Sequence, residues 1–368
     1  MKDLPNLDGV KNASLKLKGF VRVTPLDFNK RLSNSYGSSI FLKREDLQQI
    51  RSFKIRGAYN KISSLKIEEV ENGIICASAG NHAQGFALSC QKLQINGEIY
   101  MPATTPKQKI NQVKMFGGKY VKIVLVGDSY DTCQKIALKA SKKSKKTFVH
   151  PFNDPKVIEG QATIATEILN QRPKGFDYLI VPIGGGGLIS GLITVFNELS
   201  PKTKIIGVEP HGAPSMKRSI EKGKLISLKK IDKFVDGAAV KKVGDLTFKI
   251  CETNLEKIIL VPEGKICQTI LDLYNKDGIV AEPAGALAVS ALDYLENEIS
   301  NKTVCVILCG GNNDIIRMPE IKERALLFAE LKHYFLINFP QRSGALKQFV
   351  AEILGPNDDI THFRFTKK

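Results

Sequence analysis

Residues 178–199 read YLIVPIGGGGLISGLITVFNEL. A short run rich in Ile and Val leads into four glycines and then into an apolar segment, an order that predicts a buried strand, a tight turn and a helix over 188–199. Consecutive glycines are entropically costly, so they indicate backbone folded closely around a ligand, most often a phosphate; a merely tight turn is the alternative. Residues 179–196 carry no charge, but Pro182 and the glycines exclude a membrane-spanning helix.

Short apolar runs alternate with helical patterns along the rest of the chain, which is typical of parallel α/β sheets with helices on both faces. The predicted strands are 73–77, 98–101, 119–125, 178–183, 204–208, 257–261 and 303–309. Proline and glycine residues near 151–160 mark a boundary between an earlier and a later α/β unit. After Leu331 the pattern predicts a strand over 334–339, a helix over 344–354 and a strand over 360–365, which is half of a small α+β module.

Charge and cysteine content narrow the class of protein. The 368 residues carry a net charge of +17, but the lysines are spread along the chain, and the densest cluster, 139–146, lacks interleaved aromatics. We therefore expect a solvated basic surface rather than nucleic-acid or membrane binding. Seven cysteines without a Cys-x-x-Cys spacing indicate reduced thiols in the cytoplasm, and the N-terminus lacks the apolar stretch of a secretory signal.

Lys54 stands among small and apolar residues in Ser52-Phe53-Lys54-Ile55-Arg56-Gly57-Ala58, just before an amphipathic run over 58–65. On these residues alone the alternative is a surface lysine at a helix start, because most lysines are exposed.

A second segment, Ser78-Ala79-Gly80-Asn81-His82-Ala83-Gln84-Gly85, follows a predicted strand and opens a helix that runs through Cys90. The unpaired N–H groups of a helix start suit a carboxylate or a phosphate. A plain Ser or Asn cap uses the same residue types and is the alternative. No second histidine at ligand spacing supports a metal role for His82.

Two further features concern cofactor type. Glu209 lies about where a dinucleotide-binding acid would follow the glycine loop, yet the loop fails the Gly-x-Gly-x-x-Gly pattern and so favours a single phosphate. Cys309 ends an apolar strand, where α/β sheets place ligands; it is either a contact to a heterocycle or a packing residue.

Together these segments resemble the pyridoxal-phosphate enzymes of the tryptophan-synthase β-subunit fold type (fold type II), most closely the threonine dehydratases. The likeness also includes Val23-Thr24-Pro25-Leu26, Lys43-Arg44-Glu45-Asp46 and Glu282-Pro283-Ala284-Gly285-Ala286, and covers most of residues 20–330. It implies two three-layer α/β domains with mostly parallel sheets. The large one spans 1–47 and 155–330, and the small one spans 48–154 and carries Lys54.

The resemblance also implies roles for individual residues. Lys54 carries pyridoxal phosphate as a Schiff base and removes the Cα proton, with Phe53 beside it; Asn81 contacts the ring oxygen. The phosphate is held by Gly184, Gly185, Gly186, Gly187 and Leu188, and Cys309 faces the pyridine nitrogen. The substrate carboxylate is held by Ser78, Ala79, Gly80, Asn81 and His82.

The implied reaction is deamination of L-threonine, with L-serine as a secondary substrate, by a homodimer or homotetramer. Serine racemases, which look similar, carry a serine where Ala79 stands and an aspartate metal ligand where Ser215 stands, so we expect neither racemisation nor a metal site.

Residues 332–368 look like the start of an ACT-like regulatory module, which degradative threonine dehydratases usually lack. This implies the biosynthetic enzyme of the isoleucine pathway, with isoleucine as its allosteric effector. A serine-preferring or degradative dehydratase of the same fold is the alternative.

Overall fold

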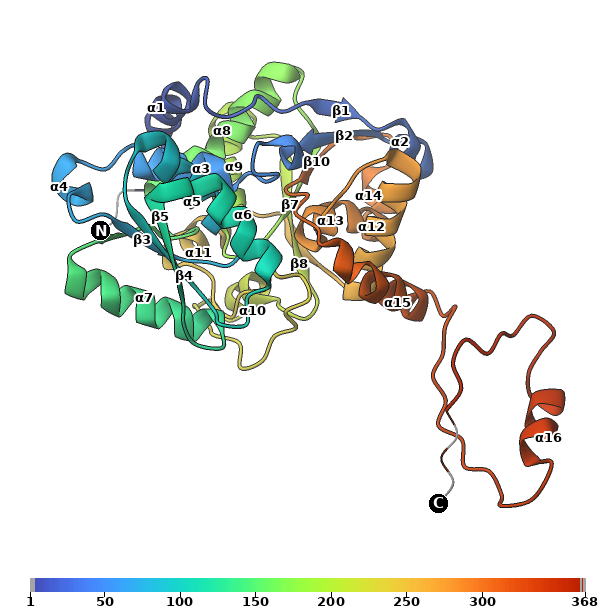
Figure 1. Ribbon diagram of the computed structural model, residues 1–368. Coiled ribbons are helices and arrows are strands. Elements are labelled where there is room, and N and C mark those ends of the chain that lie inside the picture. Colours follow the sequence, from blue (N-terminus) through green and yellow to red (C-terminus); the bar gives the residue numbers. More distant parts are fainter. Residues whose placement is uncertain (1–3, 365, 367–368) are drawn as a thin grey trace.

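Two separate β-sheets organise the chain (Figure 1), whose computed structural model describes residues 4–364 and 366. The large sheet has the strand order β1-β2-β10-β7-β8-β9, and the small sheet the order β5-β4-β3-β6. The strands are β1 (Leu26–Phe28), β2 (Ser39–Arg44), β3 (Ile74–Ala77), β4 (Gly97–Met101), β5 (Val121–Leu125), β6 (Thr147–Phe148), β7 (Tyr178–Pro182), β8 (Lys204–Pro210), β9 (Lys257–Val261) and β10 (Thr303–Leu308).

Helices connect these strands and follow them to the C-terminal segment. They are α1 (Leu7–Leu17), α2 (Lys30–Tyr36), α3 (Lys54–Ile62), α4 (Ile67–Val70), α5 (Asn81–Leu93), α6 (Lys107–Gly117), α7 (Tyr130–Ser144), α8 (Pro155–Gln171), α9 (Gly187–Leu199), α10 (Ser215–Glu221), α11 (Asp245–Cys251), α12 (Glu263–Asp277), α13 (Pro283–Ser290), α14 (Glu296–Ile299), α15 (Met318–Phe328) and α16 (Ala345–Glu352). Short 3₁₀ turns are η1 (Glu45–Leu47), η2 (Gly118–Tyr120), η3 (Leu292–Tyr294) and η4 (Ile315–Arg317).

The strand pairing is parallel throughout both sheets except between β1 and β2. Each sheet has helices on both faces, as the alternating pattern predicted. Helix α9 packs on one face of the large sheet and α13 on the other, while α5 and α7 cover the two faces of the small sheet. The central strand β7 is buried along its whole length, which explains its continuous apolar sequence.

Helices α3 and α8 cross with their backbones in contact. A Cβ atom on Gly57 of α3 would lie 2.6 Å from the Val157 carbonyl oxygen, and one on Gly160 of α8 would lie 2.6 Å from the Arg56 carbonyl oxygen. Only glycine allows this approach, so the crossing fixes α3, and with it Lys54, against the helices of the large sheet.

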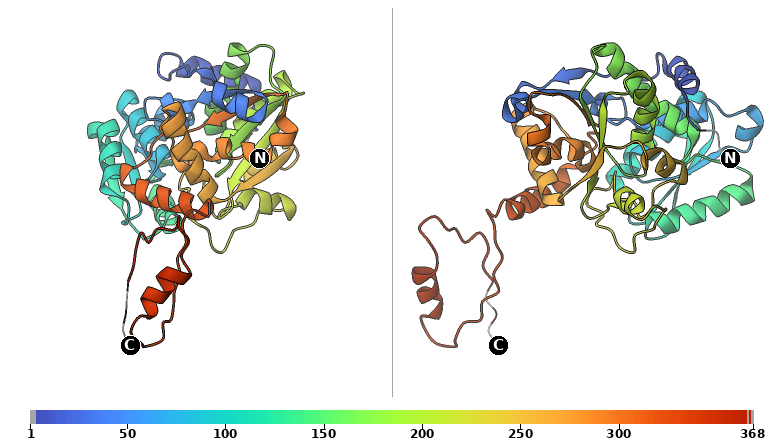
Figure 2. Two further views of the ribbon diagram at one scale, coloured as in Figure 1. Left: turned by 90° about the vertical axis from the view of Figure 1, so that its right-hand side faces the viewer. Right: turned by 180° about the vertical axis from the view of Figure 1, so that it is seen from behind.

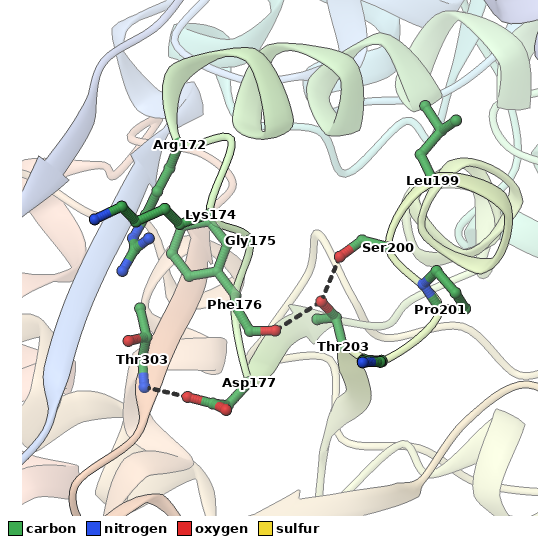
Figure 3. A pocket seen from close by; sticks show the side chains of 11 residues that line it. Arg172, Lys174, Gly175, Phe176, Asp177, Leu199, Ser200, Pro201, Thr203 and Thr303 are labelled. Atoms are coloured by element: carbon green, nitrogen blue, oxygen red, sulfur yellow. Dashed lines mark hydrogen bonds between the residues drawn. The ribbon is translucent and has the colours of Figure 1, made fainter.

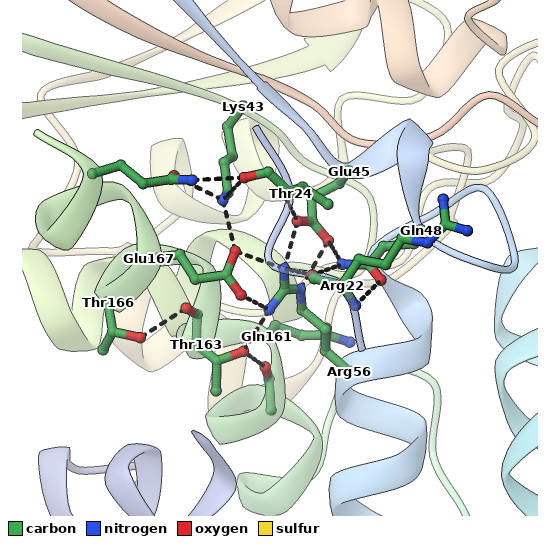
Figure 4. A network of polar contacts seen from close by, with 12 residues as sticks. Arg22, Thr24, Lys43, Glu45, Gln48, Arg56, Gln161, Thr163, Thr166 and Glu167 are labelled. Carbon is green, nitrogen blue, oxygen red and sulfur yellow. Dashed lines mark hydrogen bonds and ion pairs between the residues drawn. The ribbon is translucent and has the colours of Figure 1, made fainter. Parts of the chain in front are cut away.

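A buried network of charges lies at this crossing (Figure 4). The Arg56 guanidinium is fully buried and donates to Glu45 at 2.7 and 2.8 Å and to Glu167 at 2.6 and 2.9 Å. The buried Lys43 amine donates to Glu167 at 2.6 Å and to the Thr24 carbonyl at 2.7 Å. Burial alone would raise the pKa of Glu45, but the adjacent Arg56 outweighs it and lowers that pKa. Two cations therefore match two carboxylates and join β2, η1, α3 and α8.

Some expected elements differ from the structure. Strands β1, β2 and β6 were not predicted, and no strand forms over 334–339 or over the described part of 360–365, where Phe365 lies outside the described residues. The predicted helix between them is present as α16. Figures 1 and 2 show this segment extending away from the body, so its backbone has no neighbouring strand to pair with. Among the described residues, no helix is long and apolar enough to cross a membrane.

Arg56→Met should lower the free energy of unfolding by about 3–5 kcal/mol, because it leaves the Glu45 and Glu167 carboxylates buried without their cation. Chemical denaturation followed by circular dichroism measures this change. The matched control is Arg218→Met, which removes an exposed arginine paired with Glu221 at 3.0 Å and should cost about 1 kcal/mol or less. Equal losses in the two variants would show that burial of the network does not matter.

Candidate active site

Lys54 is the first residue of α3, and no side chain caps the start of that helix. Its amine points inward and donates to the Pro151 carbonyl oxygen at 3.0 Å. Burial lowers the pKa of Lys54 to about 8, against a smaller opposing influence of Cys309 and Glu282. At pH 7 about a tenth of the molecules therefore hold the free amine, against about one in 3,000 for an ordinary lysine.

The pocket around this amine lies at the carboxyl ends of β7 and β10. Its lining residues are Phe53, Lys54, Phe152, Pro182, Gly184, Gly185, Gly186, Gly187, Leu188, Gly237, Ala238, Ala284 and Cys309. The structure thus brings together the predicted lysine, its neighbour Phe53, the glycine loop and the predicted thiol. Ligands of α/β sheets commonly bind at this end of the strands.

The loop Gly184–Gly187 is shaped as a cradle. A Cβ atom on Gly185 would lie 2.3 Å from the Phe152 ring, and Gly186 combines a φ of +92° with a Cβ position 2.7 Å from Thr247. The loop leads into α9, whose N-terminus has no side-chain cap. Uncapped N–H groups and a positive helix end suit a phosphate, so the residues present fit the phosphate of pyridoxal phosphate facing Lys54.

The segment 78–82 follows β3 and opens α5, as predicted. Ser78 Oγ accepts from the Gly80 N–H at 3.2 Å, and the space where a Cβ of Gly80 would stand is open to 4 Å. His82 is buried with Nε2 3.3 Å from the Val149 carbonyl oxygen, and burial lowers its pKa to about 3. Its ring is therefore neutral and engaged elsewhere, so a substrate carboxylate would meet the backbone N–H of His82 rather than a charged side chain.

Cys309 is buried, and its thiol donates to the Ala284 carbonyl oxygen at 3.3 Å. Burial raises the pKa of the thiol well above its usual value. The group is accordingly a neutral thiol at physiological pH. It can contact a pyridine nitrogen, but it is too weak an acid to keep that nitrogen protonated.

Two side chains that contact Asn81, those of Glu282 and Asn312, were not predicted as site residues. Asn81 Nδ2 donates to Glu282 at 2.6 Å, and Asn312 Nδ2 donates to Asn81 Oδ1 at 2.7 Å. Burial, with the nearby Asp236, raises the pKa of Glu282 to about 7. The only sequence signal was their position: Glu282 starts the Glu-Pro-Ala-Gly-Ala motif, and Asn312 ends Cys-Gly-Gly-Asn.

A wider hollow of about 450 Å³ lies at the other end of the large sheet (Figure 3). Arg172, Lys174 and Lys202 surround it, and its polar groups bond to one another, as Asp177 does to the Thr303 N–H at 2.7 Å. Helices α8 and α9 end at this hollow, and basic side chains are favourable near helix C-termini. The basic side chains of this hollow therefore have a structural explanation.

Comparison with known proteins identifies the family of this chain. Residues 17–310 match the pyridoxal-phosphate dependent enzyme family, and residues 323–368 match the C-terminal regulatory domain of threonine dehydratase. The biosynthetic L-threonine dehydratase IlvA of Halalkalibacterium halodurans is 57% identical over 356 residues, which cover 97% of this chain and 86% of the relative.

Two solved structures have a similar fold. The processed form of threonine deaminase isoform 2 from Solanum lycopersicum has a TM-score of 0.82 at 39% identity, covering 89% of this chain and 91% of its own. Maize serine racemase has a TM-score of 0.80 at 29% identity, covering 89% of this chain and 100% of its own.

A lysine facing an uncapped glycine loop at the ends of parallel strands is the arrangement of a fold type II enzyme that uses pyridoxal phosphate, the class that the motifs predicted. The chain belongs to this pyridoxal-phosphate dependent family and, within it, to the biosynthetic threonine dehydratases.

The pKa of Lys54 predicts how fast the apoprotein captures pyridoxal phosphate. Only the unprotonated amine attacks the aldehyde, so the rate constant for colour formation should rise about tenfold per pH unit up to about pH 8 and then level off. Stopped-flow absorbance measures it. Lys156→Ala, which changes a partly exposed lysine, should follow the same curve, and Lys54→Ala should give no borohydride-stable adduct. A rate that keeps rising to pH 10 would contradict the lowered pKa.

Proposed function

We propose that this chain is a threonine ammonia-lyase that converts L-threonine into 2-oxobutanoate and ammonia, the first committed step of isoleucine biosynthesis. The observation that carries this proposal is the Lys54 amine, desolvated and without an ion-pair partner among the described residues, in a pocket shared with the uncapped Gly184–Gly187 loop. The threonine dehydratase relatives support the choice of substrate.

Pyridoxal phosphate, when bound, supplies an electron sink that weakens the bonds at the α-carbon of the substrate. Residues Gly184–Leu188 would hold its phosphate, and Asn81 and the neutral thiol of Cys309 would contact its ring. The N–H groups of 78–82 at the start of α5 bind the substrate carboxylate.

Lys54 acts as the general base that removes the Cα proton. A base works best when its pKa is near the working pH, and desolvation brings Lys54 to about 8. The Cα proton and the β-hydroxyl together make up the one water that is lost. The enamine that remains tautomerises to an imine, which water hydrolyses to the oxoacid and ammonia.

The side chain of Ala79 supports elimination over racemisation. Racemisation needs a proton donor on the cofactor face opposite the lysine, and a methyl group cannot supply a proton. Asn81 and His82 cannot replace it, since an amide N–H is too weak an acid and the His82 ring, with a pKa lowered to about 3, is neutral.

The proposal also includes an allosteric effector, an oligomeric state and a cellular compartment. The match of residues 323–368 to a regulatory domain supports an amino-acid effector, which we propose is isoleucine. Large apolar side chains of this segment, such as Phe335 and Leu336, are exposed, which favours an assembled homodimer or homotetramer over a free monomer. All seven cysteines are free and buried, which supports a reducing cytoplasm.

Steady-state kinetics test the substrate. We expect kcat/KM for L-threonine to exceed that for L-serine by about 10- to 200-fold, because one methyl group in a pocket is worth roughly 1–3 kcal/mol. Formation of 2-oxobutanoate and pyruvate measures the two reactions. Lys54→Ala should form neither product while keeping the fold.

A kcat/KM for L-serine equal to or above that for L-threonine would instead favour the serine-preferring dehydratase. Release of D-amino acid at a rate comparable to that of the oxoacid would contradict the role given to Ala79.

A further inference from the structure

The Asn81 side chain is held at both ends by residues from distant parts of the chain. Its Nδ2 donates to Glu282 Oε1 at 2.6 Å, and its Oδ1 accepts from Asn312 Nδ2 at 2.7 Å. Glu282 immediately precedes α13, and Asn312 follows β10, so both belong to the large-sheet part of the chain, whereas Asn81 begins a helix of the small sheet.

These two contacts fix which way the amide points. In the structure the Glu282 carboxyl oxygen accepts from the NH₂ end of Asn81, and the Asn312 NH₂ group donates to the oxygen end, so the two contacts together select one orientation. A flipped amide would place the Asn81 NH₂ group against the Asn312 NH₂ group, so that two donors would face each other. Among the described residues, the second N–H of Asn81 Nδ2 has no acceptor, so it could donate to an anionic ring oxygen.

We propose that Glu282 and Asn312 are positioning residues that orient the Asn81 amide so that it presents an N–H donor, and not its carbonyl oxygen, to the cofactor ring oxygen. This inference rests on the cofactor contact proposed above for Asn81, and it adds two residues to which no role had been given.

The surroundings of Glu282 support a positioning role over simple packing. The carboxylate is buried and forms no ion pair among the described residues; its partners are the Asn81 amide and the backbone N–H of Asn312. A buried carboxylate without a cation is costly, so an apolar side chain would pack here more stably. The backbone also makes room for it, since a Cβ atom on Gly310 would lie 2.2 Å from Glu282 Oε1.

Asn312 is itself held in place. Its Nδ2 also donates to the Ile50 carbonyl oxygen at 2.7 Å and lies 3.1 Å from Gln84 Oε1. Gln84 in turn donates to Gln112 of α6 at 3.0 Å. A series of hydrogen-bonded amides thus leads from Gln112 of α6 to Asn81 and ends at the Glu282 carboxylate.

Binding of pyridoxal phosphate to the apoproteins of wild type, Glu282→Ala and Glu282→Gln tests the proposal. We expect Glu282→Ala to weaken binding about five- to tenfold and to reduce the visible circular dichroism of the bound cofactor, because Asn81 loses the acceptor that orients it. Glu282→Gln keeps an acceptor oxygen and should stay within about twofold of wild type. The matched control, Glu159→Gln, changes a buried glutamate that pairs with Lys156 at 2.8 Å rather than with Asn81, and it should bind normally.

A double-mutant cycle separates positioning from a general loss of structure. If Glu282 acts through Asn81, Glu282→Ala should weaken cofactor binding little further when Asn81 is already alanine. Additive effects in the cycle, a wild-type signal in Glu282→Ala, or equal defects in the Gln and Ala variants would each overturn the proposal. None of these measurements uses an amino-acid substrate, so they succeed or fail independently of the threonine reaction.

Discussion

The matched charges around Arg56 are the constraint on which the rest of the active site depends. Buried ions are tolerated only where partners and hydrogen bonds replace water, and Lys43, Glu45, Arg56 and Glu167 satisfy one another in this way. The network holds α3 against α8 beside the Gly57–Gly160 crossing. Because Lys54 is two residues before Arg56 on α3, its backbone position is set by the same contacts.

The two basic residues of α3 have opposite electrostatic surroundings. Arg56 faces two carboxylates and stays charged, whereas Lys54 faces the Pro151 carbonyl, an aromatic ring and a neutral thiol. The difference in environment, and not in sequence neighbourhood, explains why Arg56 stays charged while the pKa of Lys54 is lowered. Because the charges around Arg56 balance and hold α3 in place, the Lys54 amine can stay desolvated without destabilising the fold.

Sequence patterns predicted what is local and missed what depends on distant partners. The strand β7, the glycine loop and α9 follow one another in the chain, so the sequence pattern of this segment predicted the strand, the turn and the helix. By contrast β2 joins the sheet through β10, which lies far along the chain. Glu282 and Asn312 were missed for the same reason, because each is recognisable only once folding brings it to Asn81. The strands expected after Leu331 failed because a favourable pattern cannot form a strand without a neighbour to pair with.

The order of the strands also has a consequence for synthesis on the ribosome. All four strands of the small sheet lie within 74–148, so that sheet is complete before most of the large sheet has been made. Strand β2 pairs with β1 at one edge. Its other edge stays unpaired until β10 has been made, because Ser39 pairs with Thr303. The nascent chain therefore carries an open strand edge through most of its translation, and this edge is where off-pathway association between nascent chains would begin.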